Sequence, residues 1–270
     1  ARGLARHYGV RLPGGLMGRR ATLKAVDGID FELARGEILG LVGESGCGKS
    51  TLTRALLGLE PVQSGSITLD GAAVYSGSKP DLAVRRKMQV VFQDPFGSFN
   101  PRHRVDRLIT EPFHLLPDPP QGAAREAAVA EALRAVGLSP DHARSPIHAF
   151  SGGQRQRISI ARALVCRPKF VVADESVAAL DVSIQADILN LLKRLQRDLD
   201  LTILFISHDL SVVAHVCDHV AVMYHGKIME QAPTRQLFSN PGHAYTRSLL
   251  SAIPSLDPDV PLRAQVYTGG

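Results

Sequence analysis

The chain has 270 residues, of which 44% are hydrophobic, and this content is enough for one large globular domain or two small ones. The 31 basic and 26 acidic residues leave a formal charge of +5, which fits a polyanionic ligand, nucleic acid or a membrane surface without selecting among them. Cys47, Cys166 and Cys217 are widely separated and odd in number, so they predict neither a disulfide framework nor a zinc site and indicate a reducing compartment.

Targeting and membrane-spanning segments are not evident in the sequence. No apolar run approaches the roughly 20 residues that a membrane-spanning helix needs, and no signal-peptide pattern begins the chain. A soluble protein is therefore expected. The first residue is Ala1 rather than methionine and the last two are glycines, so a trimmed or partial polypeptide is also expected.

The first third of the chain predicts short strands. Residues 4–10 and 24–42 have partly alternating apolar positions, and turn residues interrupt the second of these segments. A glycine-rich loop is expected at 13–18, and further strands at 67–69 and 90–92.

The segment after residue 42 carries the first chemical signature. It matches every position of G-x-x-x-x-G-K-[ST] and lies between an apolar run, 38–42, and a helical segment, 51–59. A strand, loop and helix in this order point backbone N–H groups and a helix dipole at a polyphosphate. Lys49 is expected to reach the β- and γ-phosphates and Ser50 to hold Mg²⁺. The nucleotide-binding residues predicted here are Gly43, Glu44, Ser45, Gly46, Cys47, Gly48, Lys49, Ser50 and Thr51.

The alternative for this stretch is a glycine-rich turn with a chance lysine. The complete motif and its strand–helix context disfavour that alternative. The motif predicts a nucleoside triphosphate ligand, and it does not indicate what work the triphosphate drives.

The second half of the chain predicts alternating helices and strands. Residues 103–150 are expected to form a small helical insert, because 123–136 are alanine-rich with apolar residues at helical spacing and prolines lie at the ends. Helices are then expected at 152–166 and 183–199, and strands at 170–173, 202–206 and 220–224. Because strands alternate with helices and two strands are almost wholly apolar, we expect a parallel sheet covered on both faces.

Two carboxylates follow the apolar strand at 170–173. The carboxyl ends of parallel strands form the ligand edge of a sheet, so Asp174 and Glu175 are expected to arrive beside the phosphates. Asp174 would hold Mg²⁺, and Glu175 would polarise the water that attacks the γ-phosphorus. The alternative is an acidic cap on the following helix.

The order of these motifs resembles the ATPase subunit of ABC transporters. The run from Phe150 to Arg157 is similar to the signature sequence of that family. Ser151 can cap a helix whose first turn leaves backbone N–H groups available, which makes a second anion site on the chain. In the family, the signature of one subunit closes on the ATP held by the phosphate loop of another, in a head-to-tail dimer. The residues that the resemblance assigns to this second site are Ser151, Gly152, Gly153 and Gln154.

The resemblance assigns roles to four further residues. Gln93 resembles the glutamine that senses Mg²⁺ and the attacking water, and Asp181 follows Ala179-Leu180 in the dimer-contact loop. His208 resembles the switch histidine, although taken alone it reads as an ordinary histidine at a strand end. Tyr8 resembles the aromatic residue that stacks on adenine, with a plain surface or core tyrosine as its alternative.

The sequence departs from the family at two positions near the expected catalytic glutamate. Ser176 stands where proline is common, and Ala178 stands where serine is common. Proline fixes φ, so its absence predicts a looser turn at Glu175 and puts the hydrolysis rate in doubt more than ATP binding.

Two distant stretches resemble the branch of the family that imports oligopeptides, dipeptides or nickel. The first runs from Gln93 to Arg102, and the second from His243 to Pro254, with Ala244 where proline is usual. The resemblance implies that the surface beside Gln93 and the helical insert receives a short helix of the membrane permease. Phe96 and Phe99 are candidates for that groove, with a core position as the alternative.

The resemblance implies an α/β fold with a P-loop NTPase (RecA-like) core, a mainly parallel sheet, an N-terminal antiparallel β subdomain and a helical insert. The single nucleotide-binding domain would span 1–270. Its catalytic core and β subdomain would be 1–102 and 152–232, its helical subdomain 103–151, and its C-terminal extension 233–270.

The expected function is that of an ATP-hydrolysing, Mg²⁺-dependent subunit that drives peptide import from the cytoplasmic face of the membrane. Its partners would be a second nucleotide-binding domain, two permease subunits and, indirectly, a solute-binding protein, with no nucleic acid. The rival functions are an ABC-type ATPase of DNA repair or chromosome organisation, and one of translation. A proline-broken insert without cysteine opposes the first. The exact solute and the identity of the partner domain cannot be derived from this chain.

Overall fold

The computed structural model describes residues 1–11, 20–92, 94–177 and 181–252. They form two compact units, which are described separately. The first comprises Ala1–Leu33, Leu39–Asp81 and Ser207–Gly270, and the second comprises Ala34–Ile38 and Leu82–Ile206.

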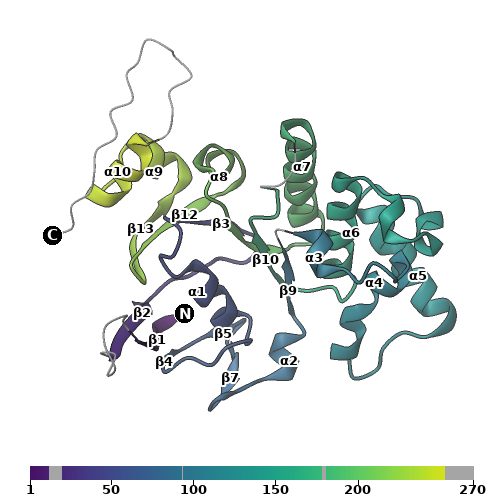
Figure 1. The fold of residues 1–270 in the computed structure, drawn as a ribbon, viewed down its shortest axis with the longest axis horizontal. Coiled ribbons are helices and arrows are strands. Elements are labelled where there is room, and N and C mark those ends of the chain that lie inside the picture. Colours follow the sequence, from purple (N-terminus) through teal and green to yellow (C-terminus); the bar gives the residue numbers. More distant parts are fainter. Residues whose placement is uncertain (12–19, 93, 178–180, 253–270) are drawn as a thin grey trace, which may run out of the picture. The chain divides into compact units, whose positions relative to one another are not determined.

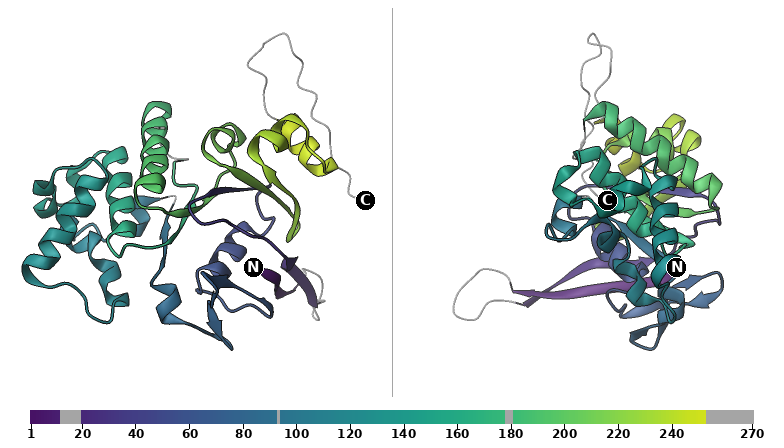
Figure 2. Two further views of the ribbon diagram at one scale, coloured as in Figure 1. Left: turned by 180° about the vertical axis from the view of Figure 1, so that it is seen from behind. Right: turned by 90° about the vertical axis from the view of Figure 1, so that its right-hand side faces the viewer.

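A three-stranded antiparallel sheet forms the N-terminal part of the first unit. Its strand order is β2-β1-β4, where β1 is Arg2–Arg11, β2 is Arg20–Ile29 and β4 is Ser64–Ser66. The two long strands pair from Leu4↔Ile29 to Arg11↔Arg20 and run side by side as a ribbon in the right view of Figure 2. Four two-residue strands follow as hairpins: β5 (Thr68–Leu69) with β6 (Ala72–Ala73), and β7 (Tyr75–Ser76) with β8 (Lys79–Pro80).

Strand β3 (Ile38–Val42) leads into the phosphate loop. It is buried at every position and pairs in parallel with β12 (His219–Tyr224), which pairs antiparallel with β13 (Lys227–Pro233). His225 and Gly226 join the last two strands with φ angles of 43° and 78°. Positive φ at both positions is the geometry of a tight hairpin turn that matches strand twist.

Four helices complete the first unit. They are α1 (Lys49–Leu56), α8 (Leu210–Val216), α9 (Thr234–Ser239) and α10 (Ala244–Ser251). Helix α1 packs on β2, α9 and α10 pack on β13, and α8 contacts α9. The C-terminal helices therefore lie against the same strands that adjoin the phosphate loop.

The second unit contains the parallel strands β11-β10-β9. They are Thr202–Ile206, Phe170–Asp174 and Met88–Val91, with registers such as Val172↔Leu204 and Val172↔Val90. Its longer helices are α5 (Gly122–Ala135), α6 (Gly152–Leu164) and α7 (Val182–Asp198). Its short helices are α2 (Leu82–Arg85), α3 (Pro95–Ser98), α4 (Val105–Ile109), η1 (Glu111–Leu115), η2 (Pro140–Arg144) and η3 (Ile147–Ala149).

Helix α6 is central to the helical part of this unit. It contacts α3, α4, α5, α7, η1 and β9, and Figure 1 shows it beside the teal helices α4 and α5. Nine of its residues are buried, from Gly153 to Leu164. The sequence prediction of a helical insert over 103–150 agrees with the helices found there.

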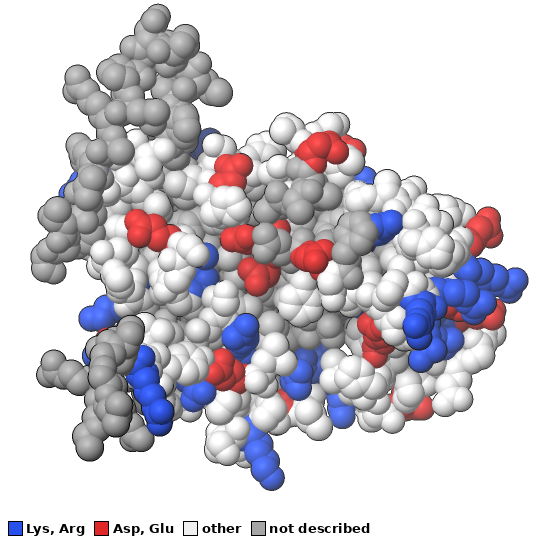
Figure 3. Space-filling view, in the orientation of Figure 1, with Lys and Arg blue, Asp and Glu red and all other residues white. Residues whose placement is uncertain are grey.

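Most predicted elements appear with small changes at their ends, and two elements were missed. Helix α8 and strand β13 were not predicted. In the described part of the chain, no helix is both long and apolar enough to span a bilayer. Basic and acidic side chains are interspersed on the face shown in Figure 3, in keeping with the small net charge.

Candidate nucleotide-binding site

The phosphate loop leaves the end of β3 and enters α1. Glu44, Ser45 and Gly46 are exposed on it, whereas Cys47 is buried. Lys49 Nζ donates to the backbone oxygens of Gly43, at 2.7 Å, and Glu44, at 3.0 Å. The lysine therefore lies across its own loop, where a phosphate oxygen could replace these carbonyls as its acceptor.

The first unit encloses the buried side of this loop. Gly48 has a φ of 112°, and a Cβ there would meet the backbone oxygen of Ala25, so only glycine fits. The Gly226 N–H donates to the Cys47 backbone oxygen at 2.8 Å. Burial raises the pKa of the Cys47 thiol although Lys49 opposes the shift. Cys47 is therefore a neutral packing residue.

The carboxylate pair lies at the carboxyl end of β10. Asp174 pairs with Ile206 of β11, and the Glu175 N–H donates to the Ile206 backbone oxygen at 2.9 Å. Glu175 has a φ of 45°, in the left-handed region. Such a conformation costs about 1 kcal/mol or more in a residue other than glycine and is concentrated at functional sites.

Ser176 is packed in place after the glutamate. It is 1% exposed, and its hydroxyl has no hydrogen-bond partner within the described residues. The expectation of a looser turn at this position remains a prediction, and Ala178 lies outside the described residues.

The signature residues begin α6, as predicted. Ser151 is the N-cap: its hydroxyl accepts from the Gln154 N–H at 3.4 Å, and its own N–H donates to Gln154 Oε1 at 3.0 Å. This reciprocal pair is a capping box. Ser151 is exposed and Gly152 is half-buried at the positive end of the helix dipole, which suits an anion.

Gly153 is buried against α7. A Cβ on it would lie 2.6 Å from Ile184 Cγ2, so the helix start packs closely only because this residue is glycine. Asp181 is exposed and caps α7, with its carboxylate accepting from the Ile184 N–H at 3.0 Å. The signature and the dimer-contact loop are thus linked through Ile184.

The remaining predicted site residues lie as follows. His208 is exposed, immediately before Asp209, which caps α8. The Tyr8 hydroxyl donates to Glu60 at 2.5 Å, and the guanidinium of Arg6 lies 4.9 Å from the Tyr8 ring centroid. Tyr8 therefore has a fixed hydroxyl and one ring face beside a cation. Gln93, Ala179 and Leu180 lie outside the described residues.

Each unit contains part of the predicted site. The phosphate loop, Tyr8 and His208 belong to the first unit, and the carboxylate pair, the signature and Asp181 belong to the second. Among the described residues, no three side chains of histidine, cysteine, aspartate or glutamate are grouped as a metal site. This fits Mg²⁺, which is often held by one or two protein oxygens together with substrate phosphates.

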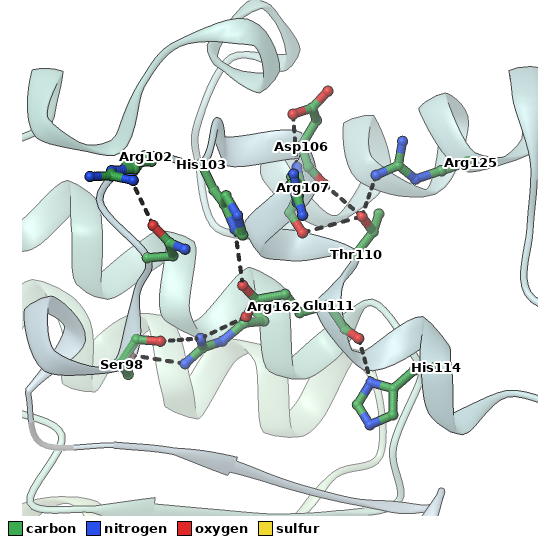
Figure 4. Close-up of polar contacts among 11 residues, drawn as sticks. Ser98, Arg102, His103, Asp106, Arg107, Thr110, Glu111, His114, Arg125 and Arg162 are labelled. Atoms are coloured by element: carbon green, nitrogen blue, oxygen red, sulfur yellow. Dashed lines mark hydrogen bonds and ion pairs between the residues drawn. The ribbon is translucent and has the colours of Figure 1, made fainter.

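A buried arginine next to the site was not predicted. Arg162 of α6 donates to the Ser98 backbone oxygen and to Ser98 Oγ, both at 3.0 Å, and pairs with Glu111 at 3.3 Å (Figure 4). Its guanidinium also lies 4.7 Å from the Phe99 ring centroid. Arg162 thus ties the stretch after Gln93 to the helix that begins with the signature. Its occurrence on the buried face of α6 was the available sequence signal.

The position of Phe99 favours the core alternative. It is 6% exposed and packs against Arg162, so it does not face an open groove in this unit. The side chain of Phe96 lies outside the described residues.

The strand–loop–helix motif, the carboxylate pair after a parallel strand and the capped glycine pair define the ATP-binding subunit of an ABC transporter. A family model described as "ABC transporter" matches residues 26–178, more than half of the chain, and the chain belongs to this family. A second model, described as "Oligopeptide/dipeptide transporter, C-terminal region", matches residues 229–267. The family assignment and the α/β P-loop fold predicted from the sequence are confirmed.

Individual proteins agree with this assignment. The chain is 50% identical to the oligopeptide transport ATP-binding protein OppF of Bacillus subtilis over 242 residues, which is 89% of this chain and 79% of OppF. Two solved structures are similar. One is cbiO1 of Clostridium perfringens, part of the ABC transporter complex cbiONQ, with a TM-score of 0.72, 30% identity and coverage of 80% of this chain and 85% of cbiO1. The other is MJ0796, a bacterial ABC transporter cassette solved as a dimer, with a TM-score of 0.71, 25% identity and coverage of 87% and 97%.

Proposed function

We propose that this chain hydrolyses ATP to drive the import of di- or oligopeptides through a separate membrane permease. The observation that carries the proposal is the 50% identity to an oligopeptide transport ATP-binding protein along most of the chain, together with the matching C-terminal region. Family membership favours transport over the alternatives in DNA repair, chromosome organisation and translation.

The phosphate loop would bind the triphosphate. Its backbone N–H groups and the start of α1 would neutralise the phosphates, and Lys49 would exchange the Gly43 and Glu44 carbonyls for phosphate oxygens. Tyr8 would stack on adenine, with its ring orientation fixed by Glu60.

Hydrolysis would depend on the residues at the end of β10. Glu175 would accept a proton from the water that attacks the γ-phosphorus, His208 would contact the γ-phosphate, and Gln93 would orient the water. Ser50 and Asp174 supply oxygen ligands of the kind that Mg²⁺ prefers, and Gln93 would add a third. The ion, when bound, would neutralise charge on the β- and γ-phosphates.

A second nucleotide-binding domain would complete each site. Ser151, Gly152, Gly153, Gln154 and Asp181 would close on the ATP of the partner domain, which we propose is an identical, paralogous or fused cassette. The dimeric MJ0796 structure supports this arrangement. Closure does work only if ATP binds the closed state more tightly than the open state.

We place the chain at the cytoplasmic face of the membrane, bound to two permease subunits. The extracytoplasmic solute-binding protein would act on it only indirectly. The division into 1–102 with 152–232, 103–151 and 233–270 is part of the same proposal.

The test is Glu175→Gln in the transporter assembled with its permease and solute-binding protein. ATP turnover and peptide uptake into vesicles should both fall at least about 100-fold, as for loss of a general base, while ATP binding stays within about two-fold. Asp187→Asn, an exposed acid-to-amide change on α7, is the matched control. Undiminished turnover in Glu175→Gln would refute the role of the glutamate, and ATP-dependent uptake of nickel but not peptides would refute the substrate class.

A further inference from the structure

The C-terminal helix α10 is fixed to the strand that precedes it. Both carboxylate oxygens of Glu230, on β13, accept backbone N–H groups at the start of the helix: Oε1 from Gly242 at 2.7 Å and Oε2 from His243 at 2.9 Å. A carboxylate that accepts two N–H groups near a helix start is favoured by hydrogen bonding and by the helix dipole. This helix is therefore an integral part of the first unit.

The first turn of α10 is also held from within. His243 Nδ1 accepts from the Tyr245 N–H at 3.0 Å, and Arg247 Nη1 donates to the backbone oxygens of Pro241, at 3.0 Å, and Gly242, at 2.9 Å. With the start of the helix fixed on both sides, Tyr245 has a defined position.

Tyr245 points into the unit and is 1% exposed. Its ring centroid lies 4.2 Å from that of Tyr224, at an interplanar angle of 39°. Its hydroxyl lies against the Glu44 backbone, and burial raises the pKa of Tyr245 to about 12. Cys47 and Tyr224 also lie close enough to act on this hydroxyl.

These neighbours are the phosphate loop and the strand end beside it. Tyr224 ends β12, and the turn after it donates the Gly226 N–H to Cys47. On the same side of the loop, a Cβ on Gly43 would meet the backbone oxygen of Met223 and lie 2.9 Å from Cys47 Sγ. The loop thus rests on a closely packed layer to which α10 contributes one large aromatic side chain.

We infer that α10 supports the phosphate loop from its buried side and that Tyr245 is a positioning residue for nucleotide binding. The C-terminal segment that matches the oligopeptide/dipeptide transporter model would thereby act on the ATP site of its own chain. The inference rests on the proposed function, because it requires the phosphate loop to bind ATP. Tyr245 itself need not touch the nucleotide.

The physical reason is preorganisation. The loop must keep several N–H groups directed at the phosphates, and a loop that loses support on its buried side must be ordered again by the ligand, which weakens binding. One hydrogen bond lost behind the loop corresponds to an affinity loss of about five-fold. Loss of the ring as well should cost at least about ten-fold.

The experiment measures equilibrium binding of Mg-ATP to the full chain and ATP turnover in the assembled transporter. Tyr245→Phe should raise the Kd and the KM for ATP about five-fold with kcat within about two-fold, and Tyr245→Leu should raise Kd and KM further. Hydrogen exchange at the Glu44 amide should also become faster in both variants.

The matched control is Leu237→Ala. Leu237 is 0% exposed on α9, which packs against β12, β13 and α8, so this variant should lower the melting temperature and leave the Kd unchanged. A purely structural role for Tyr245 would give the same pattern as Leu237→Ala, and this result would overturn the inference. Tyr245→Phe keeps the ring and hence the test, if Tyr245→Leu does not fold. Failure of the wild-type chain to bind ATP would overturn the proposed function and, with it, the inference. Wild-type binding with unchanged Tyr245 variants would overturn the inference alone.

Discussion

Arg162 offers a quantitative test of how the second unit is held together. We consider Arg162→Met, which keeps the aliphatic stem and removes the guanidinium. The change removes two bonds to Ser98, each contributing about 1 kcal/mol. It also removes the ion pair with Glu111 and the contact with the Phe99 ring, each about 1 kcal/mol because the Glu111 side chain is 37% exposed and screened by water.

The gross loss of about 4 kcal/mol is partly offset. Burial lowers the pKa of Arg162, which means that holding the charged guanidinium inside the unit has a free-energy cost that the variant avoids. We therefore expect the free energy of unfolding to fall by about 2 to 3 kcal/mol, of the order found when buried polar networks are broken. For a unit of this size, the melting temperature should fall by about 5–10 °C.

The assay is thermal unfolding followed by circular dichroism, with Arg167→Met as the matched control. Arg167 also pairs with a glutamate, Glu131, at 3.0 Å, but the two side chains are 81% and 65% exposed. This pair should contribute less than about 0.5 kcal/mol. Equal shifts in the two variants would refute the assignment of Arg162 as a buried tie, as would a double variant with Glu111→Gln whose effects add without coupling.

Two further predictions follow from local contacts. Gly153→Ala should lower stability and ATP turnover, because its Cβ would lie 2.6 Å from Ile184 Cγ2, and the added change Ile184→Ala should restore part of both; an unrestored double variant would contradict packing as the cause. The hydrogen bond from Tyr8, followed by that from Arg6, lowers the pKa of Glu60 below its ordinary value of 4.5. A lowered folded-state pKa stabilises the fold above pH 4.5 and loses this contribution as the pH falls below it, so melting temperatures measured between pH 3 and 7 should depend less on pH in Glu60→Gln than in the wild type.

Contiguous motifs were the features that the sequence predicted well. The phosphate loop, the carboxylates after β10 and the capping box of α6 each depend on residues within one short stretch, where spacing alone defines the geometry. The buried strands β10 and β11 were equally clear, because a strand covered on both faces reads as a continuous apolar run.

Features made from distant segments could not be predicted. Arg162 meets Ser98 and Glu111 only after the chain has folded, and Tyr245 reaches Glu44 across most of the sequence. Helix α8 was missed because its valines favour strands in isolation, and only its Asp209 cap indicates a helix. The left-handed φ of Glu175 had no sequence signal, since glycine is the usual residue in that region.

The turn between β12 and β13 has a practical consequence for engineering this protein. A two-residue hairpin tip is commonly chosen for inserting an epitope or a fluorophore, because insertions at exposed tips are usually tolerated. Here the Gly226 N–H is bonded to Cys47 and its carbonyl accepts from the Asp27 N–H, each at 2.8 Å. A graft at His225-Gly226 would therefore disconnect the ATP-binding motif from the N-terminal sheet, and tags belong elsewhere on the molecule.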